Sequence, residues 1–147
     1  MADIHTPETR SYNMSKIRAV NTKPEEVVRK YLFAKGFRYR KNVVDLPGKP
    51  DIVLPKYKTV IFVNGCFWHV HTGCKYFVWP ASNRTFWENK LTRNVERDKE
   101  VTSELQGQGW HVFVVWECQL KKVNRESTLE TLAESIITSW DNRLIRK

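Results

Sequence analysis

A short segment of the chain, Cys66–Cys74, contains two cysteines and two histidines within nine positions. Thiolate sulfur and imidazole nitrogen are the ligands that a tetrahedral zinc ion prefers. The chain has three cysteines, an odd number that does not suit a closed disulfide framework, so metal ligands or core thiols explain them better in a reducing compartment. The third, Cys118, stands far along the chain. A shared zinc site therefore requires a fold that brings it beside Cys66–Cys74.

Four side chains are candidates for this site: Cys66, His71, Cys74 and Cys118. Four protein ligands leave no open coordination position, so the ion would be structural. The alternative is that small buried cysteines and a surface histidine happen to cluster. If His71 binds zinc, then His69 is a free imidazole that can activate a water molecule near neutral pH. Alternatively, His69 completes a hydrogen-bond network or replaces a zinc ligand.

Helical and strand patterns alternate along the chain and predict an α/β fold. The expected order is a helix begun by Thr22-Lys23-Pro24-Glu25 and ended by Gly36, strands at 37–44, 51–54 and 59–63, a helix from Ser82 or Asn83 that stops at Gly107 and Gly109, a strand at 110–116 and a helix capped by Ser127–Glu130. The last helix is expected to present one apolar face: Leu129, Leu132, Ile136, Ile137 and Trp140. This order predicts a mixed sheet flanked by helices, in which the strand after the long helix joins parallel to an earlier one.

The bulk properties indicate one domain and a polyanionic partner. A chain of 147 residues can bury one core but is short for two domains. Residues 1–21 are polar and basic and are expected to form an arm, followed by a domain over 22–147. The net charge of +9 favours nucleic acid first and an anionic membrane surface second. No apolar run approaches the roughly 20 residues of a membrane span, and the start of the sequence lacks a secretory leader, so an intracellular location is expected.

Asp51 follows Pro50 at the start of a predicted strand, a position at which nucleases commonly hold Mg²⁺. The second acid and the lysine of the usual pattern are missing from residues 61–64. A backbone carbonyl near Val63 could replace the acid, and His69 could replace the lysine. The alternative for Asp51 is a turn or strand-start aspartate.

Glu25 and several aromatic residues each allow two interpretations. Glu25 is either catalytic or the return partner of Thr22 in a helix-capping box. Four large aromatic residues stand beside polar or basic positions: Phe67, Trp68, Phe86 and Trp87. Such side chains either enter a base stack as apolar wedges or fill an ordinary core.

Over nearly its whole length the chain resembles the very short patch repair endonucleases, which nick DNA beside T:G mismatches that arise from deaminated 5-methylcytosine. Six blocks carry the resemblance in order: Thr9-Arg10-Ser11 with Asn13-Met14, Leu46–Asp51, Asn64–His69, Phe86-Trp87 with Lys90, Asn94–Asp98 and Val115–Cys118. The resemblance implies a restriction-endonuclease-like α/β core, catalytic Mg²⁺, structural Zn²⁺ and double-stranded DNA with a T:G mismatch as the substrate. It also implies a bacterial cytoplasmic protein that works at the nucleoid, with downstream repair proteins as further partners.

The resemblance also implies a role for individual residues. Asp51 would bind Mg²⁺, His69 would act as the general base, and Glu25 would support the site from the first helix. The zinc ligands would be the four candidates named above. Seven residues are implied in DNA binding, of which three aromatics wedge into the duplex, three others lie near the mismatched pair and one belongs to the arm: Phe67, Trp68 and Trp87, then Met14, Lys90 and Asn94, then Arg10.

Two other classes of protein compete with this interpretation. A restriction or homing-type endonuclease on the same scaffold would cut both strands, which requires dimerisation, and the chain has no heptad seam for it. A basic monomer is therefore expected to nick one strand. A non-catalytic zinc module that only binds DNA would leave Asp51 and His69 unexplained. Mg²⁺-dependent nicking separates the enzymes from the binding module.

Overall fold

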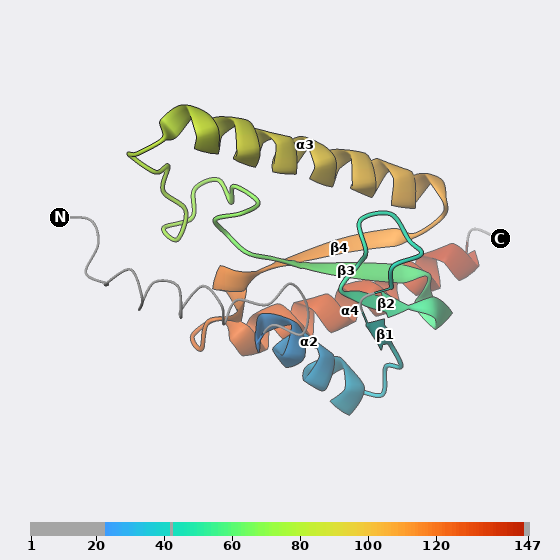
Figure 1. Cartoon of the computed structure of the whole chain (residues 1–147). Coiled ribbons are helices and arrows are strands. Elements are labelled where there is room, and N and C mark those ends of the chain that lie inside the picture. The colour runs from blue at the N-terminus through green and yellow to red at the C-terminus, as the bar shows by residue number, and fades with distance from the viewer. Residues whose placement is uncertain (1–22, 42, 146–147) are drawn as a thin grey trace.

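The structure, a computed structural model, describes residues 23–41 and 43–145. The predicted arm over residues 1–21, with Arg10 and Met14, lies outside these residues. The described elements follow the predicted order (Figure 1): α2 (Lys23–Ala34), β1 (Arg40–Lys41), β2 (Ile52–Leu54), the 3₁₀ helix η1 (Pro55–Tyr57), β3 (Thr59–Asn64), α3 (Arg84–Gly107), β4 (His111–Trp116), the 3₁₀ helix η2 (Glu117–Leu120) and α4 (Arg125–Ile145). The α/β class is confirmed.

The four strands form one mixed sheet in the order β1-β2-β3-β4. The pairs β1/β2 and β2/β3 are antiparallel. The pair β3/β4 is parallel, with Thr59 opposite His111 and Asn64 opposite Trp116. A parallel pair needs a long crossover, and α3 supplies it. The predicted parallel strand after the long helix is therefore confirmed.

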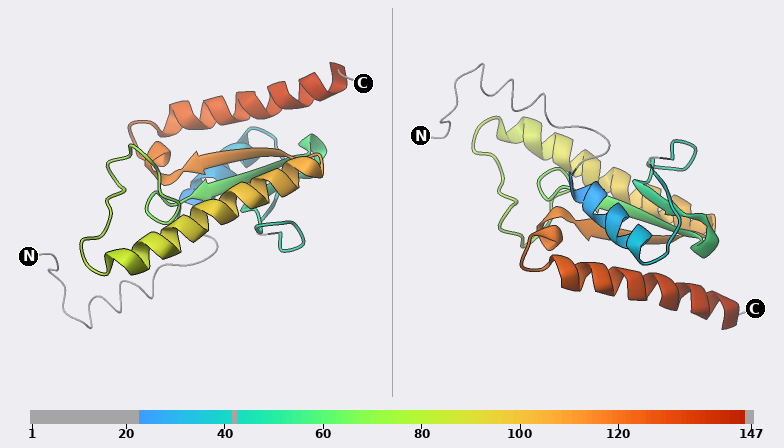
Figure 2. Two further views of the ribbon diagram at one scale, coloured as in Figure 1. Left: turned by 90° about the horizontal axis from the view of Figure 1, so that it is seen from above. Right: turned by 90° about the horizontal axis from the view of Figure 1, so that it is seen from below.

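Alternate residues of the central strands point to opposite faces of the sheet, as the two-residue period of a strand requires. On one face Ile52, Leu54 and Ile61 pack in a core cluster with buried residues of α2 and α4. On the other face Val53 and Val60 pack with Leu105 of α3. Figure 2 shows α3 on one side of the sheet and α4 on the other. Each of these fully buried side chains contributes about 1.5–3 kcal/mol relative to exposure.

Helix α3 is much longer than the strands that it connects. Its 24 residues span about 36 Å, whereas the six residues of β3 span about 20 Å. The C-terminal part, with Leu105, covers the sheet, and the N-terminal part reaches beyond it to the segment between β3 and α3 (Figure 1). Most of α3 is polar, and none of the described helices is long and apolar enough to cross a membrane.

Two boundaries differ from the prediction. The strand expected at 37–44 is reduced to Arg40–Lys41, the two residues that pair with β2. The chain turns before β2, where Gly48 and Lys49 adopt left-handed backbone angles. Helix α4 begins before the predicted cap at Ser127, since the amides of Asn124 and Arg125 both donate to the carbonyl of Lys121 at 2.9 Å and start the winding there.

The prediction that Ile137 belongs to the buried apolar face of α4 is wrong. Leu129, Leu132 and Ile136 are buried, but Ile137 is 44% exposed. A residue one step further along a helix is rotated by about 100°. Ile137 therefore points away from the core that Ile136 enters.

Candidate active site and metal cluster

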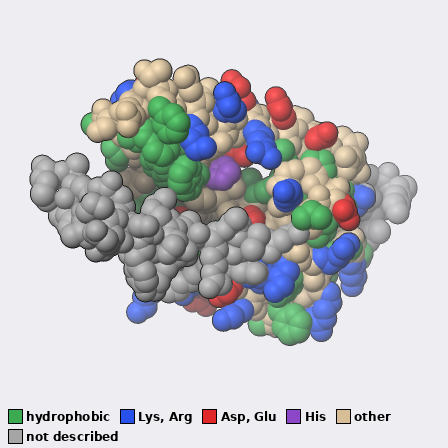
Figure 3. All heavy atoms as spheres, in the orientation of Figure 1, with side chains coloured by type: hydrophobic (Ala, Val, Ile, Leu, Met, Phe, Trp, Pro, Cys, Tyr) green, Lys and Arg blue, Asp and Glu red, His purple; other side chains and the backbone are tan. Residues whose placement is uncertain are grey.

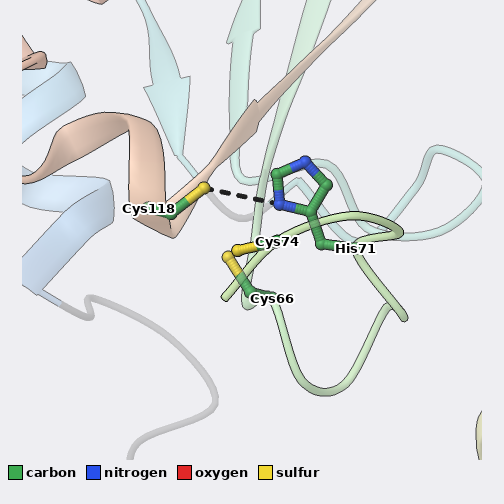
Figure 4. A group of neighbouring side chains, drawn as sticks. All are labelled: Cys66, His71, Cys74 and Cys118. Atoms are coloured by element: carbon green, nitrogen blue, oxygen red, sulfur yellow. Dashed lines mark hydrogen bonds between the residues drawn. The ribbon is translucent and has the colours of Figure 1, made fainter. Parts of the chain in front are cut away.

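The four predicted zinc ligands come together in the structure. One ligand atom from each lies within 4.8 Å of the others, at Cys66, His71, Cys74 and Cys118 (Figure 4). Cys66 lies just beyond the end of β3, and Cys118 lies in η2, just beyond the end of β4. The parallel register that places Asn64 opposite Trp116 brings these strand ends together. The fold thus brings Cys118 beside Cys66–Cys74, as a shared metal site requires.

The distance between two of the donor atoms fits a tetrahedral metal ion. A tetrahedral zinc ion holds sulfur and nitrogen ligands about 3.6 Å apart, and the distance between His71 Nδ1 and Cys118 Sγ is 3.4 Å. The His71 ring stacks on Trp116 with 4.0 Å between centroids and 2° between planes. The His71 amide donates to the Cys66 carbonyl at 3.0 Å. These contacts hold the imidazole in place beside the thiols.

The thiol groups differ in their acidity. Burial raises the pKa of Cys66 to about 12, and burial also raises the pKa of Cys118. At Cys74 slight burial is outweighed by hydrogen bonds from the amide of Tyr76 and from the neighbouring thiols, which lower its pKa. Because metal ligands must be deprotonated, an ion in this cluster would displace protons from the buried thiols.

A pair of acidic side chains lies at the junction of α2 and the sheet. Asp51 stands directly before β2 and accepts a hydrogen bond of 2.7 Å from the amide of Val63 in β3. Glu25 of α2 is 4% exposed and shares a side-chain hydrogen bond with Asp51. The guanidinium of Arg29 lies 3.5 Å from the Glu25 carboxylate. Glu25 therefore reaches the site whether or not it also caps its helix, and Thr22, its predicted capping partner, lies outside the described residues.

The environment of Asp51 opposes its ionisation. Burial, with the negative charge and the hydrogen bond of Glu25, raises the pKa of Asp51 to about 7, although the amide of Val63 and the nearby His69 act in the opposite direction. The negative charge of Glu25 thus makes the ionisation of Asp51 less favourable. A bound cation would relieve that repulsion, and carboxyl groups with shifted pKa values are frequent at functional sites.

His69 is held by a residue that the sequence reasoning did not assign to the site. Its Nδ1 lies 2.6 Å from the carboxylate of Asp98 in α3. Asp98 belongs to the block Asn94–Asp98. It also lies three residues from two apolar residues of the same helix, Val95 and Val101, and this spacing is the signal in the sequence that could have found it. Between His69 and His71 the chain is turned and not extended, because Val70 takes a left-handed conformation (φ 50°), which is uncommon for a β-branched residue.

The predicted wedge aromatics form one cluster. The ring centroids of Phe67 and Trp68 are 5.2 Å apart, those of Phe67 and Trp87 5.4 Å, and those of Trp68 and Trp87 5.9 Å. Trp68 is 39% exposed, and Phe86, in contact with Trp87, is also exposed. Hydrophobic side chains gather on the surface at this end of α3, with a histidine side chain beside them (Figure 3). These aromatic side chains thus form a partly exposed cluster and not part of the buried core.

Two further predicted DNA contacts lie on α3. Lys90 is exposed. Asn94 is partly buried, and its side-chain amide donates to the backbone carbonyl of Trp68 at 3.1 Å. In the structure Asn94 therefore contacts the protein itself, next to the aromatic cluster.

The arrangement of Glu25, Asp51 and His69 limits the reactions that this site can catalyse. The negative charge of Glu25 opposes the ionisation of Asp51, and one ring nitrogen of His69 lies against the carboxylate of Asp98. An acid pair that favours a cation, next to an oriented imidazole, suits the hydrolysis of a phosphodiester bond. In a chain of net charge +9 the class of protein is an endonuclease that acts on nucleic acid.

Comparison with known proteins gives the particular family. The family model of the DNA mismatch endonuclease Vsr matches residues 2–75. The type II nicking enzyme V.NmeAIP of Neisseria meningitidis is 50% identical over 147 residues, which cover 100% of this chain and 96% of that protein. The DNA mismatch endonuclease Vsr of Escherichia coli is 43% identical over 92% of this chain and 88% of that protein. The type II nicking enzyme V.XorIIP of Xanthomonas oryzae is 45% identical over 82% and 88%. The chain belongs to the Vsr family of endonucleases.

Proposed function

We propose that this endonuclease cuts one DNA strand beside a T:G mismatch, with Mg²⁺ at Asp51 and a structural Zn²⁺ in the Cys₃His cluster. The observation that carries the proposal is the convergence of Asp51, Glu25 and His69 beside an exposed aromatic cluster. The restriction-endonuclease-like core is part of the proposal. The names of the relatives, nicking enzymes and mismatch endonucleases, support a cut in one strand.

The donor atoms of the acid pair fit Mg²⁺. Magnesium prefers oxygen ligands and usually binds through one or two carboxylates while it retains water. Asp51 and Glu25 would hold the ion, which would supply positive charge to orient the scissile phosphate and stabilise the transition state. Binding a dication would also favour the ionised form of Asp51, whose pKa is raised mainly by burial.

The proton transfer falls to His69. If Nδ1 carries the proton that is shared with Asp98, then Nε2 is left as the acceptor and can take a proton from the attacking water. Asp98 also stabilises the imidazolium that results. His69 is therefore the proposed catalytic base, and Asp98 is a residue that positions it.

Zinc is proposed for the cluster because its donors are three sulfurs and one imidazole nitrogen, a set that suits zinc and not magnesium. The proposed unit is a monomer, since one set of catalytic residues cuts one strand. We place the protein in the bacterial cytoplasm at the nucleoid, where its proposed substrate and downstream repair proteins are found.

The proposal is tested by incubating the purified protein with supercoiled plasmid and with short duplexes that carry one T:G pair or the matched pair. We expect Mg²⁺-dependent nicking of one strand at the T:G duplex and little cleavage of the matched duplex. Binding without cleavage in Mg²⁺ would favour the non-catalytic module. Cleavage of both strands of the matched duplex would favour a restriction-type enzyme.

Replacing His69 with alanine is expected to slow single-turnover nicking by about 10²–10⁴-fold, the usual loss for a positioned general base. Zinc content should stay the same, since His71 and not His69 lies in the cluster. Asp98→Asn should reduce the rate less, because the imidazole that accepts the proton is still present and only its positioning is weakened. Loss of zinc in His69→Ala would show that the division of roles between His69 and His71 is wrong.

Trp68→Ala is expected to lower the ratio of T:G to matched-duplex cleavage. A T:G wobble pair unstacks more easily than a matched pair, so an aromatic wedge enters the duplex there at a lower cost. Contacts from basic residues to phosphates add affinity that is common to all duplexes. Arg10→Ala is the matched control and should weaken cleavage of both substrates about equally. An unchanged ratio in Trp68→Ala would place discrimination elsewhere.

A further inference from the structure

One face of α3 contacts several parts of the proposed site in turn. The residues along this face follow at steps of three or four: Trp87, Leu91, Asn94, Asp98, Val101 and Leu105. Such steps place side chains on one side of a helix. The first belongs to the aromatic cluster and the last packs on the sheet. Between them, Asn94 and Asp98 lie where the helix passes the loop after β3.

Two side chains on this face hold two consecutive residues of the loop. The amide of Asn94 donates to the carbonyl of Trp68 at 3.1 Å. The carboxylate of Asp98, one helical turn further on, lies 2.6 Å from Nδ1 of His69. One contact fixes the backbone beside the proposed wedge, and the other fixes the proposed base. Because Trp68 and His69 share a peptide bond, neither residue can move far while the other contact persists.

The same face also meets the segment that leads to Asp51. A Cβ atom added to Gly48 would lie 2.4 Å from Cγ1 of Val101, so the backbone of the turn before β2 lies directly against α3. Gly48 also has a φ of 72°, which favours glycine. The helix therefore touches both the loop with Trp68 and His69 and the turn that precedes Asp51.

We propose that Asn94 and Asp98 form a two-point clamp by which α3 positions Trp68 and His69 together, so that entry of Trp68 beside a lesion also sets His69 at the scissile phosphate. This inference rests on the proposed function. It assigns the Asn94 amide to the protein backbone and makes Asn94 a positioning residue. The left-handed turn at Val70 adds a reason for the clamp, since a backbone conformation that is unfavourable for valine persists only when its surroundings hold it.

The clamp predicts effects in the full-length, zinc-loaded protein without DNA. Asn94→Leu keeps the shape of the side chain but removes its donor. We expect the NMR signals of the Trp68 indole and the His69 ring to shift at fixed pH. The amide of His69, which donates to the carbonyl of Gly65 at 3.2 Å, should exchange with solvent about 2- to 10-fold faster, the range expected for loss of one hydrogen bond. Glu96→Gln, an exposed change on the same helix, is the control and should alter neither signal.

The same variants are then assayed by single-turnover nicking of the T:G duplex. Asn94→Leu is expected to slow nicking by about 2- to 10-fold with DNA affinity nearly unchanged. The double variant Asn94→Leu with Asp98→Ala should lose less than the product of the two single effects, since both changes release the same loop.

Three outcomes would overturn the clamp. The first is that the NMR signals of Trp68 and His69 in DNA-free Asn94→Leu match those of the wild type. If this variant nevertheless loses T:G nicking, Asn94 is assigned to DNA contact instead. Shifted signals with wild-type nicking, or strictly independent effects in the double variant, would also overturn it. A wild-type protein that shows no T:G preference would refute the proposed function instead, and the DNA-free measurements still report on the two contacts.

Discussion

Replacing Asp51 with asparagine is expected to abolish nicking and, at the same time, to stabilise the magnesium-free protein at pH 8. Nicking should fail because the variant lacks the carboxylate proposed to hold Mg²⁺ at the phosphate. Stability should rise because Asp51 is a buried acid that shares a hydrogen bond with Glu25, and its ionisation opposes folding when no cation is bound. The neutral amide of asparagine removes that charge and keeps the size of the side chain.

The direction of the pH effect follows from the pKa of Asp51. Its pKa is raised from 3.8 to about 7 in the folded protein, chiefly by burial. Between these values the folded state binds a proton that the unfolded state has released, so stability falls as the pH rises from 3.8 through 7. The full loss is at most about 4 kcal/mol. Well below pH 3.8 the acid is neutral in both states, and even at pH 4 the variant should gain little.

Thermal unfolding of the protein at pH 4 and pH 8, without Mg²⁺, measures this effect. The variant is compared with the wild type at each pH, so that a loss of zinc at pH 4 is common to both. At about 2–4 °C per kcal/mol for a chain of this size, Asp51→Asn should melt several degrees above the wild type at pH 8 and much closer to it at pH 4. Asp45→Asn, an exposed change in the turn before β2, is the control and should show no such difference. Substantial nicking by Asp51→Asn in Mg²⁺, or an equal shift at both pH values, would contradict the assignment.

The sequence predicted the features that depend on local patterns. The apolar periods of α3 and β4 specified a helix followed by a strand, and a crossover of that length allows a parallel pair. The ligand types in Cys66–Cys74 indicated a metal site because few other arrangements need two thiols and an imidazole so close together. The presence of Cys118 in the cluster then followed from the parallel register of β3 and β4.

Contacts between distant segments could not be predicted in the same way. The pairing of His69 with Asp98, 29 positions apart, and of Trp68 with Asn94, 26 apart, depends on how far α3 extends past the sheet. No periodicity in the sequence encodes that overlap. The contact of Glu25 with Asp51 likewise depends on where α2 lies against β2. The true length of β1 was not predicted either, because it depends on how many residues pair with β2, and only Arg40 and Lys41 do.

Replacing Cys118 with serine is expected to release zinc and to lower the melting temperature by 10 °C or more, roughly 3 kcal/mol or more for a chain of this size. Cys118 is the one cluster residue that joins the end of β4 to the loop after β3, so its loss opens the cluster between separate parts of the chain. Ligands assembled only in the folded state add the free energy of metal binding to stability. Elemental analysis of the purified protein should give about one zinc per wild-type chain and far less for Cys118→Ser.

Cys118→His is the matched comparison, because imidazole is also a zinc ligand, and it should retain more metal and stability than Cys118→Ser. Zinc should act on the rate by holding His69 in place and not by taking part in the reaction. His69 is two residues from His71, and the turn between them ties the proposed base to the cluster, so metal loss should slow nicking even at temperatures where Cys118→Ser stays folded. Asp51 is held separately by the amide of Val63, and Mg²⁺ should therefore not restore the rate. A folded Cys118→Ser protein that lacks zinc and nicks at the wild-type rate would show that the cluster supports neither stability nor the position of His69.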